Sequence, residues 1–277
     1  MARQLLTDDE WDCIADLFGE PAATGRPPVD RRKVVNGILW ILRTGSPWRD
    51  LPEEFGKWQT AWRLFDQWNA GCCARAVARL ALRCGRHQPG TVVRGRHRGP
   101  CRPLLGRRWK KSDPQEPDDH ALGRSRGGFS SKIHLLCDAH GHPLHFHLTA
   151  GQDHEATALK PLLEGADESL VDHDGEPVAW PLQMAGDKAY RADWIDEYLL
   201  SLEIQPVIPS KSNQDQSERP IEFDREAYRG RNIVERLVGW LKENRRIFSR
   251  FEKTAINFGG MLKLAFIRRY LRLMCAE

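Results

Sequence analysis

The 277-residue sequence lacks several features that would set it apart from ordinary globular proteins. No apolar run approaches the ~20 residues that a membrane-spanning helix needs, so we expect no membrane partner. The first residues show no basic stretch followed by an apolar run, so we expect no secretory signal and a cytoplasmic location. The seven cysteines are odd in number and irregularly spaced. They therefore predict reduced thiols and not a disulfide framework.

One long segment lacks acidic residues. From Asp66 to Asp113 the intervening chain has twelve Lys and Arg residues and no Asp or Glu. A local excess of positive charge is typical of chains that bind a polyanion such as DNA, and a solvated basic linker is the other interpretation. Arg, Gly, Pro and Cys dominate within this segment and apolar periodicity is weak. We therefore predict a basic, irregular linker over residues 72–112.

Helical periodicity is present before that linker, and residues 1–71 predict a small all-α module. Thr7 and Glu10 form a capping-box pattern ahead of a short helix, and Asp30 can cap the next helix. Short helices joined by turns can present a recognition helix to DNA, whereas packing or dimerisation is the other interpretation.

After the linker, strand and helix patterns alternate. Two apolar segments flank a turn of loop-forming residues and predict a β-hairpin, and two later apolar segments alternate with helices. This order predicts a mixed α/β sheet with flanking helices over residues 113–277. The predicted strands are 132–137, 144–149, 182–185 and 204–208, and the predicted closing helices are 228–248 and 255–273.

The first closing helix carries a line of polar side chains. At about 100° per residue, Tyr228, Arg231, Glu235 and Lys242 project from one narrow stripe. The opposite side is apolar: Ile233, Val234, Leu237, Val238, Trp240 and Leu241. A carboxylate flanked by cations suits a site where a metal ion meets phosphates. An exposed salt-bridge face is the other interpretation.

A second carboxylate, Asp187, follows an apolar strand and a glycine. Open α/β sheets expose catalytic side chains at such strand ends, although an Asp there can also be a helix cap. Asp187 and Glu235 together could hold a divalent metal if an earlier strand supplied a third carboxylate.

Two other metal sites have weaker support. His145 and His147 share one strand face that is also typical of a partly exposed edge, and Cys84, His97 and Cys101 lack a paired C-x2-C spacing.

The spacing Tyr228-x2-Arg231-x3-Glu235-x6-Lys242 resembles the Y-(2)-R-(3)-E-(6)-K signature of bacterial insertion-sequence transposases of the DDE kind. The similarity extends over residues 1–70 and 112–272. Further similar segments are 6–11, 48–52, 118–129, 186–190, 231–236 and 240–246.

This resemblance implies a ribonuclease-H-like catalytic domain over residues 113–277 and a DNA-end-binding module over residues 1–71. It implies Asp187 and Glu235 as catalytic metal ligands, and Tyr228, Arg231 and Lys242 as DNA contacts. The implied cofactor is Mg²⁺, with Mn²⁺ as a substitute. The implied partners are double-stranded DNA, as terminal inverted repeats and target, and further copies of the chain on that DNA. A bacterial, nucleoid-associated protein is implied.

The chain departs from the family at the first catalytic Asp. The family has a segment like Asp-Gly-Thr-Val-Val-Arg, and the corresponding segment is Pro89-Gly-Thr-Val-Val-Arg94. We hypothesise a locally frameshifted or decayed copy, which translation of the other two reading frames would test. The nearest substitutes all lie in predicted loops or turns: Asp113, Asp118, Asp119 and Asp138. We therefore predict a transposase that binds DNA and cleaves it poorly or not at all. The alternatives are an inactive DNA-binding remnant or repressor and a nuclease without joining activity.

Overall fold

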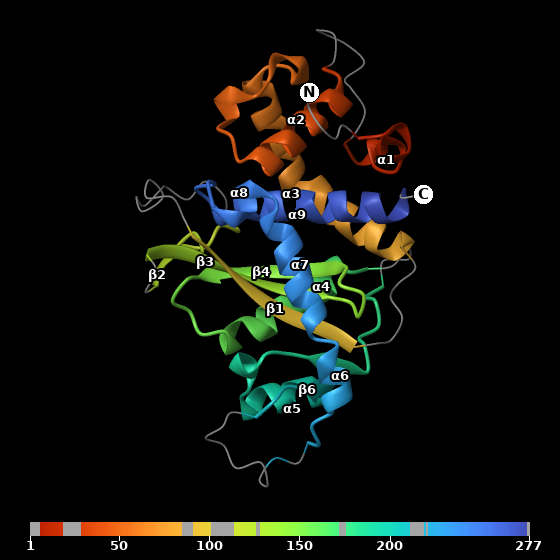
Figure 1. Ribbon diagram of the computed structural model, residues 1–277, viewed down its shortest axis with the longest axis vertical. Coiled ribbons are helices and arrows are strands. Elements are labelled where there is room, and N and C mark those ends of the chain that lie inside the picture. Colours follow the sequence, from red (N-terminus) through yellow and green to blue (C-terminus); the bar gives the residue numbers. More distant parts are fainter. Residues whose placement is uncertain are drawn as a thin grey trace.

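The computed structural model of the chain describes residues 6–18, 29–84, 91–100, 114–125, 128–171, 176–210, 219 and 221–275. For residues 70, 72, 74 and 91–100 it describes the backbone alone. The N-terminal part is helical, and the rest combines strands with helices (Figure 1). The N-terminal helices are α1 (Asp8–Asp12), η1 (Ala15–Phe18), α2 (Arg31–Thr44), η2 (Trp48–Asp50), η3 (Glu53–Phe55) and α3 (Trp58–Arg83).

The strands and later helices follow the predicted alternation, which confirms the mixed α/β class. The strands are β1 (Thr91–Pro100), β2 (Gly123–Ser125), β3 (Gly128–Cys137), β4 (Pro143–Ala150), β5 (Gln183–Ala185) and β6 (Gln205–Val207). The helices are η5 (Ala156–Ala158), α4 (Leu159–Ser169), η6 (Lys188–Tyr190), α5 (Asp193–Ser201), α6 (Arg225–Arg229), α7 (Asn232–Lys242), α8 (Arg245–Phe248) and α9 (Ala255–Met274).

All six strands belong to one sheet with an antiparallel half and a parallel half. β3 pairs antiparallel with β1 on one side and with β4 and β2 on the other. β1 also pairs parallel with β5, which pairs parallel with β6. The spatial order along the sheet is therefore β4-β3-β1-β5-β6. β1 is the strand at which the two halves meet.

Apolar side chains cover both faces of this sheet because successive residues of a strand point to opposite sides. Ile133 and Leu135 of β3 belong to one buried cluster with α7, α9 and the N-terminal helices. Leu136 belongs to a second cluster with α4 and α5. In the described residues, no helix is long and apolar enough to cross a membrane.

The N-terminal helices join this core through α3, which packs along α9 (Figure 1). Asn69 Nδ2 of α3 donates a 2.8 Å hydrogen bond to the carbonyl of Ile256. A Cβ on Gly260 would lie 2.5 Å from Asn69 Cγ, so this close approach of the two helices requires glycine. The predicted capping box of Thr7 and Glu10 is present at α1, and Asp30 caps α2.

Two predicted boundaries are corrected by the structure. Helix α3 continues to Arg83, beyond the end predicted at residue 71, and β1 lies inside the segment predicted to be irregular, 72–112. The Arg-rich and Gly-rich composition of β1 concealed the strand, which is defined by pairing with β3 and β5. The sheet therefore begins before residue 113.

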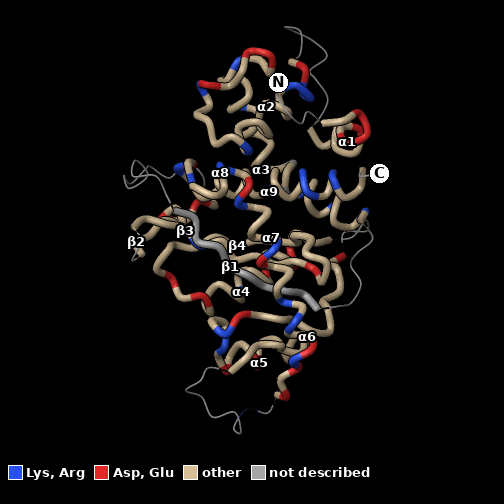
Figure 2. Tube along the Cα trace, viewed as in Figure 1, with Lys and Arg blue, Asp and Glu red and all other residues tan. Residues whose placement is uncertain are grey.

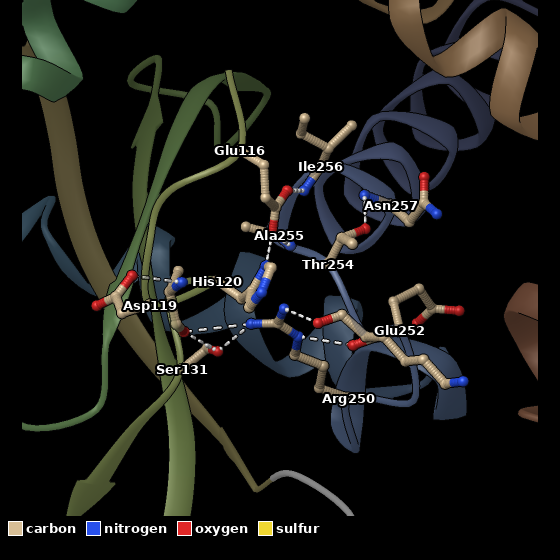
Figure 3. Close-up of polar contacts among 12 residues, drawn as sticks. Glu116, Asp119, His120, Ser131, Arg250, Glu252, Thr254, Ala255, Ile256 and Asn257 are labelled. Atoms are coloured by element: carbon tan, nitrogen blue, oxygen red, sulfur yellow. Dashed lines mark hydrogen bonds and ion pairs between the residues drawn. The ribbon is translucent and has the colours of Figure 1, made fainter. Parts of the chain in front are cut away.

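A buried arginine connects β3 with the segment that precedes α9 (Figure 3). The Arg250 guanidinium donates to Ser131 Oγ and to the carbonyls of Ala121, Glu252 and Lys253. Beside it, the Glu116 carboxylate accepts hydrogen bonds from the first two backbone N–H groups of α9, at 2.6 and 2.9 Å. A carboxylate at a helix N-terminus is stabilised by the helix dipole, so this network fixes where α9 begins.

Candidate active site

Asp187 lies just beyond the carboxyl end of β5, as predicted. Gly186 separates it from the strand, and Asp187 takes the N-cap position of η6. Its carboxylate makes no capping hydrogen bond to η6, whose residues are all described. The helix-cap interpretation therefore does not account for Asp187, and its half-buried carboxylate can serve another purpose.

The turn after Asp187 is fixed to the sheet by two side chains that the sequence analysis did not assign to the site. Tyr190 ends η6 and is fully buried, and its hydroxyl lies 2.8 Å from His134 Nδ1 on β3. The other ring nitrogen of His134 lies 2.9 Å from Thr149 Oγ1 on β4. This chain of polar contacts spans two strands and holds the backbone next to Asp187. The sequence signal for Tyr190 is its place in the family-like segment 186–190, three residues after Asp187.

The helix predicted over 228–248 is three helices, α6, α7 and α8, which corrects the prediction. Between α6 and α7 the backbone keeps right-handed helical dihedral angles, but the hydrogen bonds become i to i−3, as from Arg231 N to the carbonyl of Tyr228. A 3₁₀ turn has three residues per turn and eclipses side chains three apart. The Arg231 guanidinium accordingly lies 5.4 Å from the centre of the Tyr228 ring.

Helix α7 packs by the predicted apolar side. Val234, Leu237, Val238 and Leu241 are buried, and Ile233 and Trp240 are partly buried. Glu235 and Lys242 lie on the exposed side. The polar stripe is therefore present on α7, although Tyr228 belongs to the preceding helix.

Glu235 is paired with Arg231. Arg231 Nη2 lies 2.8 Å from Glu235 Oε1, and the Glu235 side chain is 63% exposed. The partner of Glu235 in the salt-bridge interpretation is thus Arg231, four residues earlier, and Tyr228 stacks on the same guanidinium.

The two carboxylates come from adjoining elements. α7 packs against β1, the strand hydrogen-bonded to β5 (Figure 1). Figure 2 shows charged residues along α7 in the same region. Lys and Arg residues also occur on α8 and α9.

β1 carries no Asp or Glu between Thr91 and Pro100. Its register pairs Val93 with Ala185 of β5. If the same register is continued for two residues beyond this pair, Gly95 stands opposite Asp187, and no earlier residue of β1 does. Pro89 lies outside the described residues.

The donor atoms of Asp187 and Glu235 fit a hard divalent cation. Mg²⁺ prefers oxygen ligands and is commonly bound by one or two carboxylates together with water and substrate phosphates. Asp187 makes no capping hydrogen bond, and the ion pair of Glu235 is exposed and therefore weak. Both carboxylates can accept a cation at little cost.

Several other candidates from the sequence have contacts or surroundings of their own. Asp119 accepts a turn hydrogen bond from Ala121 N, and Asp138 accepts hydrogen bonds in the β3–β4 turn. His145 and His147 border a cavity of about 330 Å³. Asp113 and Cys101 lie outside the described residues, as does the side chain of His97.

Two family models match the chain. The model described as "Transposase DDE domain" matches residues 90–268, which include Asp187 and Glu235. The model described as "Putative transposase of IS4/5 family" matches residues 6–77.

Curated relatives agree with these matches. The chain is 33% identical over 196 residues to the "Putative transposase for insertion sequence element IS402" of Burkholderia cepacia, covering 70% of this chain and 82% of the relative. It is 39% identical over 77 residues to the "Insertion element IS402 uncharacterized 16.2 kDa protein" of the same organism, covering 25% of this chain and 52% of the relative.

A solved structure, "Mos1 transposase paired-end complex with left transposon end", aligns with this chain at 14% identity, covering 91% of this chain and 80% of the solved chain. Its TM-score of 0.28 is too low to establish a shared fold.

Proposed function

The chain belongs to the DDE transposases of the IS4/5 family, and from this premise we propose that Asp187 and Glu235 are the carboxylates of its active site. The observation that supports this most strongly is their placement. Asp187 follows β5, and Glu235 lies on α7, which packs against the neighbouring strand β1. Both carboxylates therefore belong to segments that border β1, since β5 pairs with this strand and α7 packs against it.

The fold that we propose for the catalytic part is ribonuclease-H-like. The order β4-β3-β1-β5-β6 supports it, since an antiparallel half and a parallel half meet at β1. The helices α4 and α5 on one face, and α7 on the other, agree with that fold.

DDE transposases use divalent metal ions, and we propose Mg²⁺, with Mn²⁺ as a substitute, for Asp187 and Glu235. When bound, such an ion supplies activation of the attacking hydroxyl and neutralises charge that develops on the phosphate. The chain's own contribution is to hold the two carboxylates in position, one just after β5 and one on α7, so that little reorganisation is needed during the reaction.

Arg231, Tyr228 and Lys242 are proposed to contact the DNA backbone. In the free chain Arg231 is bonded to Glu235, and an exposed pair four residues apart contributes only about 0.3–0.5 kcal/mol. DNA phosphates can therefore draw Arg231 away and leave the Glu235 carboxylate for the cation. The salt-bridge and functional interpretations of this face are thus compatible.

The partners that we propose are double-stranded DNA, as terminal inverted repeats and target, and further copies of the chain on that DNA. The helices matched by the IS4/5 model, within residues 6–77, are the part proposed to recognise the ends. The family matches do not favour an inactive remnant or repressor.

A strand-transfer assay on terminal-repeat DNA with Mg²⁺ or Mn²⁺ tests the assignment. We expect slow cleavage by the unmodified chain, since β1 supplies no third carboxylate. Asp187→Asn and Glu235→Gln should abolish the remaining cleavage and leave DNA binding in place.

The matched controls are Asp193→Asn, in the first turn of α5, and Glu243→Gln, which is exposed just after α7. Both should retain the activity of the unmodified chain. Cleavage that survives in Asp187→Asn or Glu235→Gln would refute the assignment.

A further inference from the structure

The turn between β3 and β4 brings together three side chains that can bind a metal ion. Asp138, His140 and His142 occupy alternate positions, and one ligand atom of each lies within 4.8 Å of the other two. From the sequence, Asp138 was a candidate only as a substitute for the missing catalytic carboxylate. We propose that these three residues form a site for a divalent transition metal, with Zn²⁺ as the ion that fits, separate from Asp187 and Glu235.

The distances support a shared ion. Asp138 Oδ2 lies 2.7 Å from His142 Nδ1 and 3.8 Å from His140 Nδ1. Ligands about 2.0–2.1 Å from a tetrahedral Zn²⁺ lie about 3.4 Å from one another. Both distances are within about 0.7 Å of that value, so small side-chain rotations suffice to close the site.

The backbone of the turn already holds the carboxylate in position. Asp138 Oδ1 accepts hydrogen bonds from His140 N at 2.8 Å and from His142 N at 2.9 Å. The other oxygen, Oδ2, is the atom that faces the two imidazoles. Oδ1 therefore stabilises the backbone of the turn, whereas Oδ2 faces the proposed ion.

The surroundings of the turn restrict its movement. Gly141 has φ +80°, and a Cβ there would lie 2.9 Å from Ile233 Cγ1 on α7. The Tyr270 hydroxyl of α9 donates a 2.8 Å hydrogen bond to the Pro143 carbonyl. A site held between two helices loses little entropy when it orders around an ion.

The donor set selects the kind of ion. Imidazole nitrogens suit Zn²⁺ and neighbouring transition metals, whereas Mg²⁺ takes oxygen ligands. His142 is buried and His140 is 62% exposed, so an ion can enter from the His140 side and keep water as a further ligand. This distinguishes the turn from the two carboxylates of the proposed active site.

Zinc binding by the full-length protein tests the proposal. Equilibrium dialysis would be done under reducing conditions, with Mg²⁺ in excess to occupy carboxylate-only sites. We expect the unmodified chain to bind one Zn²⁺ that raises its Tm. Loss of an outer-shell partner weakens a metal site about 10- to 100-fold, so His140→Ala, which removes a ligand, should weaken this Zn²⁺ by at least about 10-fold.

His154→Ala is the matched control, because His154 is an exposed histidine outside the turn, and it should bind Zn²⁺ like the unmodified chain. Co²⁺ in place of Zn²⁺ should give a visible spectrum of nitrogen and oxygen ligands. Equal Zn²⁺ affinity in the unmodified chain and in His140→Ala would overturn the proposal. A thiolate-to-cobalt charge-transfer band at one equivalent of Co²⁺ would also overturn it, since the ion would then be held by cysteines.

Discussion

Arg231 takes part in both interpretations of the polar stripe, the exposed salt-bridge face and the site where a metal ion meets DNA phosphates. It contacts Glu235 at 2.8 Å and lies over the Tyr228 ring, so it connects three of the four residues of the family signature. Its side chain is 22% exposed, against 63% for Glu235. A guanidinium that is partly covered and already oriented needs little further ordering to bind a phosphate.

The salt dependence of DNA binding tests this role. Each phosphate contact contributes about 0.9 to the slope of log K against log salt concentration on B-DNA. We expect Arg231→Ala and Lys242→Ala each to reduce that slope by about 1. The measurement is a titration of terminal-repeat DNA at several salt concentrations.

Arg236→Ala is the control, since Arg236 is exposed on the same helix but lies about 100° around it from Glu235. It should change the slope less than the other two variants. A slope that is unchanged in Arg231→Ala would remove Arg231 from the DNA contacts.

His145 gives the stability of the protein a defined pH dependence. Burial lowers the pKa of His145 from 6.5 to about 4, and the charges of His147 and Lys263 act in the same direction. Because the folded pKa lies below the unfolded one, the unfolded chain binds the extra proton between these values. The free energy of unfolding should therefore fall as the pH drops from about 6.5 to about 4.

Urea unfolding of the unmodified chain and of His145→Gln, at several pH values across this window, measures the effect. In His145→Gln the free energy of unfolding should fall less over this pH range than in the unmodified chain. The control is His154→Gln, at an exposed histidine, and its free energy of unfolding should vary with pH as in the unmodified chain. Parallel profiles for the unmodified chain and His145→Gln would contradict the lowered pKa.

Strand β1 is the element whose placement decides the geometry of the site. The family resemblance points to residue 89 as the position of the first carboxylate, whereas the pairing of Val93 with Ala185 brings Gly95 level with Asp187.

An Asp at each position distinguishes the two alignments. We expect Gly95→Asp to raise strand cleavage above that of the unmodified chain, and Pro89→Asp to raise it less. The strand-transfer assay on terminal-repeat DNA is the measurement, with Gly95→Asn as the uncharged control. Greater cleavage by Pro89→Asp would show that β1 pairs differently on DNA.

The larger of the two buried clusters extends from the N-terminal helices to the sheet. Ile38 of α2, Phe65 of α3 and Phe258 of α9 belong to it together with Ile133 of β3. The N-terminal helices and the sheet therefore share a core.

A fragment of residues 113–277 tests this sharing. It lacks β1, which is hydrogen-bonded to both β3 and β5, and it lacks α3, which packs on α9. We expect a broad, non-cooperative urea transition by circular dichroism. A fragment of residues 6–277 should unfold as sharply as the full chain. An equally sharp transition in the 113–277 fragment would mean that this part folds alone.

The local patterns of the sequence were sufficient for several elements. The hairpin of β3 and β4, the capping box at Thr7 and the apolar side of α7 follow from periodicity and capping, which depend on residues no more than a few positions apart. The position of Asp187 after a strand was predicted in the same way.

Only the tertiary structure decided how these elements meet. The pairing of β1 with β3 and β5 joins segments far apart in the chain, and no local pattern in an Arg-rich and Gly-rich segment specifies it. The tight turn that brings Arg231 over Tyr228 interrupts a helical pattern that continues through it. The packing of the turn with Asp138, His140 and His142 against α7 and α9 likewise joins segments far apart in the chain. Long-range packing selects among conformations that are locally similar in energy, and for that reason these features were decided by the fold.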